Sequence, residues 1–154
     1  MKLRVSVRKL TAKDKAASLL IIRRTLGARW AKKANRSFSL ILGHDRRPYV
    51  LADMKIIICK NKQVGIFGLY RFDTHPTNAI GIDWLAIAPE YQHMGLGTKA
   101  VKWCINEARK RKHRMIFVWT SEERAAAFYE NFGFRRSSMN IRPHETKILL
   151  TKKL

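Results

Sequence analysis

Residues 85–98 read Leu-Ala-Ile-Ala-Pro-Glu-Tyr-Gln-His-Met-Gly-Leu-Gly-Thr, and this stretch decides the fold. Its first residues end the apolar segment Ala79–Ala88, which is typical of a β-strand that Pro89 stops. A helix is predicted to begin at Gly95-Leu96-Gly97, because apolar side chains then recur at helical spacing through residues 100–108. Backbone N–H groups at such a strand–turn–helix junction can bind a pyrophosphate, although a lone Gly-x-Gly more often only bends the chain.

The residues before this unit predict one strand and two helices. Leu3–Val7 alternates apolar and polar side chains, which indicates a β-strand. Thr11 and Asp14 stand at the spacing of a capping box, so we expect a helix that begins there and ends near Gly27. Residues 30–42 have one apolar face and predict a second helix.

The middle of the chain predicts three antiparallel strands in series. The β-branched run in Met54–Cys59 and the segment Val64–Phe72 form a hairpin around a turn at Asn61-Lys62. A loop containing Pro76 then leads to Ala79–Ala88 as the third strand.

After Gly95-Leu96-Gly97 and the helix that begins there, the pattern indicates a buried strand, a helix and two final strands. Met115–Trp119 is apolar without alternation, as expected at the centre of a sheet. Ser121–Asn131 returns to helical spacing, and Gly133 can end that helix in a left-handed conformation. Two strand-like segments, Phe134–Ile141 and Thr146–Leu150, close an α+β fold.

Composition favours one globular domain over residues 1–154. A chain of 154 residues with 46% hydrophobic residues suits a single hydrophobic core. No apolar leader follows Met1, and no apolar run approaches the roughly 20 residues that span a bilayer, so we expect a soluble, cytoplasmic protein without membrane contact. Cys59 and Cys104 lie in apolar periodic segments, which favours buried thiols.

The charge is the unusual feature of the composition. The 32 Lys and Arg against 11 Asp and Glu give a net charge of +21. Two interpretations stay open: a basic surface without a dedicated partner, or contact with RNA, DNA or the ribosome. The basic segment that favours the second interpretation contains Arg23, Arg24, Arg29, Lys32, Lys33 and Arg36.

Two motifs resemble one known family. Residues 85–97 are similar to the acetyl-CoA-binding motif of the GNAT superfamily, in which Gln or Arg is followed after two residues by Gly-x-Gly or Gly-x-Ala. Residues 125–134, with Phe128-Tyr129 and Gly133-Phe134, resemble its second signature. The resemblance is strong from Ile80 to Phe134. It implies an N-acetyltransferase that uses acetyl-CoA as co-substrate, with a mixed, mostly antiparallel, splayed sheet flanked by about four helices.

The resemblance also implies where acetyl-CoA binds. Backbone groups of Leu85 and Ile87 would pair with the pantetheine arm like an added strand. The pyrophosphate would be lined by the residues of the glycine turn, which are Gln92, His93, Met94, Gly95, Leu96, Gly97 and Thr98. A metal ion has no part in this interpretation.

The same resemblance suggests the catalytic groups. Tyr129 would protonate the departing thiolate, a task for a phenol with an ordinary pKa of about 10, although an aromatic residue that only packs is the alternative. Asp83 is the best candidate for the base that neutralises the acceptor amine, with a surface acid as its alternative. His93 is a second candidate base that is expected to face solvent.

Two positions depart from the family pattern. Glu122 stands where an Asn often contacts pantetheine, and Gly81 stands where a Glu is frequent. Catalysis without a protein base is still open, since backbone N–H groups such as that of Ile87 can stabilise an oxyanion.

The acceptor is not named by any residue. A strongly basic protein repels polyamines, so a protein N-terminus, a lysine or a nucleic-acid-linked amine is favoured. An aminoacyl-tRNA-acetylating toxin of the same superfamily and a CoA-binding, nucleic-acid-associated module without turnover remain as alternatives.

Overall fold

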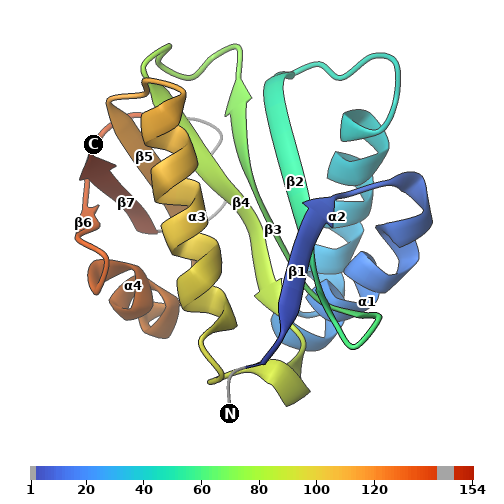
Figure 1. Ribbon diagram of the computed structural model, residues 1–154. Coiled ribbons are helices and arrows are strands. Elements are labelled where there is room, and N and C mark those ends of the chain that lie inside the picture. Colours follow the sequence, from blue (N-terminus) through green and yellow to red (C-terminus); the bar gives the residue numbers. More distant parts are fainter. Residues whose placement is uncertain (1–2, 142–147) are drawn as a thin grey trace.

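A computed structural model describes residues 3–141 and 148–154 of the protein (Figure 1). The helices are α1 (Lys15–Leu26), α2 (Ala28–Ile41), α3 (Leu96–Lys110) and α4 (Glu123–Glu130), with short 3-10 turns at Ala12–Asp14 and Pro89–Tyr91. The strands are β1 (Val5–Lys9), β2 (Tyr49–Cys59), β3 (Lys62–Phe72), β4 (Ala79–Ile87), β5 (Met115–Thr120), β6 (Arg135–Arg136) and β7 (Ile148–Lys153).

The strands form one sheet in the order β1-β2-β3-β4-β5-β7-β6. All neighbouring pairs are antiparallel except β4 and β5, which run parallel. The predicted run of three antiparallel strands and the predicted mixed, mostly antiparallel α+β fold are therefore confirmed.

Helices cover both faces of the sheet (Figure 1). On one face, α3 and α4 contribute Val101, Cys104 and Ala126 to a buried cluster with Ile80 of β4. On the other face, α1 and α2 bury apolar side chains against Ile66 of β3. Met115–Thr120 supplies alternate residues to both clusters, which confirms that it is a strand covered on both faces.

The hairpin between β2 and β3 differs from the prediction in its turn. Lys60 and Asn61 are the two turn residues, with φ of 50° and 63°, and Cys59 pairs with Lys62. Two successive residues with positive φ suit the right-handed twist of a hairpin, so the turn lies one residue earlier than predicted. β2 also begins at Tyr49 instead of near Met54, because β3 is long enough to pair with this irregular segment up to Phe72.

The outer strands differ from the prediction in their limits. β1 is shifted towards Lys9, and the expected strand Phe134–Ile141 is reduced to Arg135–Arg136. The backbone N–H of Ser137 still donates to the carbonyl of Leu149 at 2.9 Å, but the exposed residues 138–140 then leave the sheet. β7 continues to Lys153, and residues 146–147 of its predicted start lie outside the described residues.

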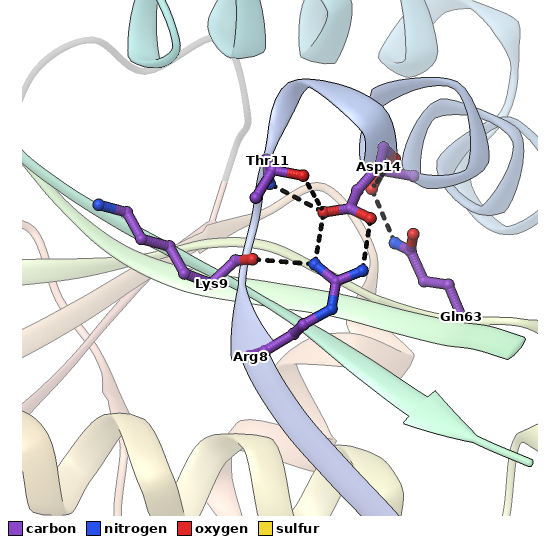
Figure 2. Close-up of polar contacts among 6 residues, drawn as sticks. Arg8, Lys9, Thr11, Asp14 and Gln63 are labelled. Carbon is purple, nitrogen blue, oxygen red and sulfur yellow. Dashed lines mark hydrogen bonds and ion pairs between the residues drawn. The ribbon is translucent and has the colours of Figure 1, made fainter. Parts of the chain in front are cut away.

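The junction of β1 and α1 is held by a buried carboxylate (Figure 2). Both oxygens of Asp14 accept hydrogen bonds of 2.8 Å from the guanidinium of Arg8, while the N–H and hydroxyl of Thr11 donate to Oδ2 at 2.8 and 2.9 Å. Hydrogen bonds from Arg8, and then from Thr11, lower the pKa of Asp14 to about 2 although burial opposes the shift. The predicted pairing of Thr11 with Asp14 is confirmed. The ion pair between Arg8 and Asp14 was not predicted.

A second chain of hydrogen bonds joins this junction to the sheet. The hydroxyl of Ser18 donates to the carbonyl of Asp14 at 2.8 Å and accepts from Nε2 of Gln63 at 2.7 Å. Because Gln63 belongs to β3, the start of α1 is attached to the hairpin as well as to β1.

We expect Asp14→Asn to lower the free energy of unfolding at pH 7 by about 1 to 2 kcal/mol, since a depressed carboxylate pKa reports this order of stabilisation after screening of the half-exposed Arg8. A depressed pKa stabilises the fold above the unfolded-state value of about 3.9 and loses this contribution as the pH falls towards about 2. Urea unfolding at several pH values measures the difference, with Asp73→Asn as an exposed control. A difference that did not shrink between pH 4 and pH 2 would contradict the assignment.

Candidate active site

The site begins where β4 and β5 separate. The two strands are paired only between Ala79–Gly81 and Met115–Phe117, so the rest of β4 has an open edge on the β5 side. The N–H of Ala88 donates to Val64 of β3 at 2.8 Å. Alternate residues of a strand direct their backbone groups to opposite sides, so Ile87 directs its N–H towards the open edge.

A β-bulge at Trp84 accompanies this separation. Between Asp83 and Ala86, β4 contains one residue more than the paired segment of β3, and Trp84 has a φ of 47°. A bulge bends its strand and increases the local twist. Leu85 therefore lies within the bulge and Ile87 lies beyond it, and both belong to the part of β4 that β5 does not pair with.

The turn after β4 leaves several backbone donors without a helical partner. His93 and Gly95 have positive φ of 61° and 84°, and the first hydrogen bond of α3 runs from Lys99 to Gly95 at 3.1 Å. The N–H groups of residues 96–98 therefore lie at the helix N-terminus, and no side chain caps it. A Cβ added to Gly95 would meet no atom within 4 Å, so this side of the turn is open. Such donors fit a pyrophosphate.

The predicted phosphate-lining residues share this turn but differ in orientation. Nε2 of Gln92 donates to the carbonyl of Ile87 at 2.9 Å, so this side chain ties the turn back to β4. His93 and Met94 are exposed, Leu96 is buried in the core, and Gly97 and Thr98 are partly buried in the first turn of α3.

Tyr129 lies on the α3 face of the sheet. Its side chain is buried on α4, edge-on to the rings of Phe128 and Phe134 with centroids 5.3 and 5.7 Å away. Phe128 also approaches the glycine turn, since a Cβ on Gly97 would lie 3.4 Å from its Cζ. Burial, and then the neighbouring Cys104, raise the pKa of Tyr129 well above its ordinary value. The phenol therefore stays protonated at neutral pH.

Asp83 lies on the opposite face of the sheet. Its Oδ2 is buried and has no hydrogen-bond partner within residues 3–141 and 148–154. Burial raises the pKa of Asp83 to about 7, although a hydrogen bond from the Trp84 backbone opposes the shift. Tyr49 and Tyr70 have pKa values raised by burial and by the charge of Asp83, which places all three in one enclosure.

Aromatic rings explain why position 81 departs from the family pattern. A Cβ on Gly81 would lie 2.5 Å from Cε1 of Tyr70 and 2.7 Å from Cε2 of Phe117. These rings contact each other and the buried His75, with centroids 5.0 to 5.8 Å apart. Sequence reasoning missed this aromatic enclosure, for which the only signal was the number of aromatic residues in β3. Because position 81 carries no acid, Asp83 is the carboxylate that lies beside this aromatic enclosure.

Glu122, the other departure, precedes α4. It is exposed, and its carbonyl accepts the N–H of Ala126 at 3.0 Å in the first turn of the helix.

The basic segment lies on α1 and α2. Arg29 and Lys33 lie 5.9 and 5.1 Å from the ring centroid of Trp30, which is itself edge-on to Trp84 at 6.4 Å. Burial, and then repulsion by Arg29 and Arg36, lower the pKa of Lys33. Positive charge on α2 therefore adjoins the Asp83 side of β4.

The remaining residues of the basic segment are exposed. Arg24 forms an ion pair with Glu90, next to the glycine turn, whereas Arg23, Lys32 and Arg36 are exposed on the two helices.

The sequence matches a family model described as Acetyltransferase (GNAT) family over residues 19–134. The chain belongs to this family. It is accordingly an acetyl-CoA-dependent acetyltransferase, and acetyl-CoA is its co-substrate. Comparison with curated proteins finds no match.

Solved structures share the GNAT fold. A GNAT-family protein from Desulfovibrio desulfuricans has a TM-score of 0.82 at 19% identity, covering 97% of this chain and 99% of that chain. The ribosomal-protein-S18-alanine N-acetyltransferase from Escherichia coli has a TM-score of 0.72 at 20% identity, covering 97% and 94%. The PaiA N-acetyltransferase from Thermoplasma acidophilum, solved with coenzyme A, has a TM-score of 0.76 at 15% identity, covering 99% and 100%. Within the described residues, no helix of this protein has the length and apolarity to cross a membrane.

We expect acetyl-CoA to raise the free energy of unfolding by about 2.7 kcal/mol at a free concentration of 100 times its Kd. Gly97→Asp should abolish this gain, because it places a carboxylate against the phosphate donors of the α3 N-terminus. Gly97→Ala is the matched control, since its methyl group would only reach contact with Phe128 at 3.4 Å. Thermal unfolding with and without acetyl-CoA measures the shift, and an unchanged Tm of the wild type at millimolar acetyl-CoA would refute the predicted site.

Proposed function

We propose that this GNAT enzyme acetylates a primary amine that enters from the α1–α2 face, with Asp83 as the base and Tyr129 as the acid. The observation that carries this proposal is the carboxylate of Asp83, a partly exposed residue whose Oδ2 is buried and has no hydrogen-bond partner among the described residues. It lies at the bulged strand β4, on the face opposite Tyr129. The acceptor amine and the thiol can therefore occupy opposite sides of the same opening.

The two proton transfers that acetylation of an amine requires suit these two groups. An acceptor amine is protonated at neutral pH and must lose a proton before it can act as a nucleophile. A carboxylate with a pKa of about 7 can accept that proton and is still partly ionised. The phenol of Tyr129 is protonated at neutral pH, since burial raises its pKa above the ordinary value of about 10, so it can offer this proton to the thiolate as it departs.

In this proposal, backbone groups at the open edge of β4 bind acetyl-CoA. Acetyl-CoA supplies the thioester whose acetyl group is transferred. The N–H of Ile87 faces the open edge and is a candidate donor to the pantetheine arm or to the oxygen that gains charge. Gln92 holds this segment by its bond to the Ile87 carbonyl, so that carbonyl is already engaged.

For Asp83→Asn we expect kcat/KM to fall by about 10² to 10⁴, the usual contribution of a general base. The wild-type value should rise with pH and level off above about 7, and the variant should lack this inflection. The same acceptor is used for both proteins, so ionisation of the amine is common to both profiles. An identical inflection in the variant would exclude Asp83 as the base.

Stability of the same variant provides its folding control. A carboxyl pKa raised above the unfolded-state value means that the folded state binds the extra proton, so stability falls as the pH rises from about 4 to about 7. Asp83→Asn should remove this loss and unfold at higher urea concentration than the wild type at pH 8. A loss of activity in a protein that is no less stable cannot come from unfolding.

Tyr129→Phe should lower kcat by about 10² to 10⁴ with little change in KM for acetyl-CoA, because only the proton donor is removed. Tyr91→Phe, a partly buried tyrosine near the glycine turn, is the matched control. Steady-state kinetics with single-turnover measurements shows whether chemistry limits the rate. If chemistry limits the rate and kcat is still unchanged, Tyr129 only packs and does not donate a proton.

The acceptor class follows from charge. The cations of α2 beside Trp84 favour an amine carried on an anionic partner, such as a protein N-terminus or lysine on the ribosome, or an aminoacyl-tRNA. The Escherichia coli neighbour is an N-acetyltransferase for an alanine of a ribosomal protein, which is compatible with this class. Rates with N-terminal peptides, lysine peptides and aminoacyl-tRNA separate a peptide acceptor from the toxin alternative. A protein that binds acetyl-CoA but turns over no acceptor would support the non-catalytic module.

A further inference from the structure

A basic groove lies on the α3 face, away from the glycine turn. It is a hollow of about 280 Å³ between α3, the turn that follows α4, and β7. Its lining residues are Lys102, Ile105, Asn106, Arg109, Phe132 and Lys152. The amino group of Lys152 lies against the turn, since a Cβ on Gly133 would be 2.7 Å from its Nζ.

The groove carries positive charge, and none of its described lining residues is an acid that could neutralise it. Lys102 and Arg109 come from α3, Lys152 comes from β7, and no Asp or Glu of the described chain lines the groove. The nearest acids along the chain bond elsewhere, Glu107 to Arg111 and Glu130 to Arg136. Three cations that converge from two elements form a site for phosphate oxygens.

The floor of the groove is apolar. Phe132 is partly buried and edge-on to Phe128, with centroids 5.2 Å apart, and Ile105 is buried beside it. Asn106 adds an amide that can donate and accept hydrogen bonds. An aromatic ring within a cationic rim is the arrangement that binds single-stranded nucleic acid, in which a base stacks while the phosphates meet Lys and Arg. A phosphate or an acidic side chain alone would make no use of the ring.

We propose that this groove seats one nucleotide of a single-stranded RNA, with its base on Phe132 and its phosphates on Lys102, Arg109 and Lys152. The net charge of +21 favours a polyanion over a free nucleotide. Lys102 and Arg109 follow Gly97 by five and twelve residues, which is about 8 and 18 Å along a helix, so the groove begins more than one turn beyond the N-terminus of α3. The proposal does not depend on the acetylation mechanism.

Fluorescence anisotropy with a labelled eight-nucleotide oligouridylate tests the groove, in the presence of saturating acetyl-CoA and at several salt concentrations. The two phosphates that flank one nucleotide of a single strand give a slope of about −1.4 in log K against log salt. Joint replacement of Lys102, Arg109 and Lys152 by Gln should flatten this slope by about that amount. The matched control replaces Lys110, Lys112 and Arg114 by Gln, which removes the same charge outside the groove.

Three results would overturn the proposal. Equal weakening by both triple variants would mean that RNA binding reflects diffuse charge. Displacement of the RNA by AMP, or by an acidic peptide, at concentrations comparable with the oligouridylate would assign the groove to a free nucleotide or to a protein. Phe132→Leu keeps apolar bulk but removes the stacking surface, so it should weaken RNA binding without changing the salt slope, and unchanged affinity would contradict base stacking.

The thermal shift with acetyl-CoA is measured on every variant. It should stay unchanged in both triple variants, because the groove lies outside the glycine turn. A lost shift would show damage to the fold or to the acetyl-CoA site, and the failure of one proposal can thus be told from the failure of the other.

Discussion

The early parting of β4 from β5 is the constraint on which the rest of the site depends. Parallel strands normally continue to exchange hydrogen bonds along their length, but here the pairing ends at Gly81 and Phe117. Backbone groups that would have been satisfied by β5 become a fixed row of donors and acceptors. Because β4 is held on its other edge by β3, this row keeps its shape without a ligand.

Burial has opposite chemical consequences on the two sides of this opening. On one side it keeps the phenol of Tyr129 protonated, and on the other it brings the carboxyl of Asp83 to the edge of ionisation near neutral pH. In the mechanism proposed above, the first of these groups is the proton donor and the second is the proton acceptor. The cost is a carboxylate oxygen without a partner among the described residues, which is typical of sites where activity is kept at the expense of stability.

Local patterns allowed most of the fold to be predicted. A helical period located α3, whereas apolar runs bounded by turn residues located β3, β4 and β5, which are buried without strict alternation. The exact position of the hairpin turn, the start of β2 at Tyr49 and the two-residue β6 depend on pairing with distant strands, and no local pattern reports them. The glycine turn was predicted from its motif, but no local pattern reports the hydrogen bond from Gln92 back to the carbonyl of Ile87.

The surroundings of the candidate base and of the groove could not be predicted from the sequence, because they are formed by contacts between segments that are distant along the chain. Asp83 was singled out by its place on the strand, yet its enclosure by Tyr49 and Tyr70 joins β2 to β3. Likewise, Lys152 and Lys102 are far apart in sequence and meet only because β7 inserts between β5 and β6. Arg8 was missed although its partner Asp14 is only six residues away, because the capping-box spacing relates Asp14 to Thr11 alone.

The glycine at position 81 has a consequence for how this site can change over evolution. Tyr70 and Phe117 occupy the volume into which any side chain at this position would grow. A carboxylate could be introduced there only after both rings had been exchanged for smaller residues, and those exchanges alone would leave a cavity. Each single step therefore passes through a less stable protein. The three positions form an epistatic set, and relatives with an acid at this point should differ from this protein at all three together.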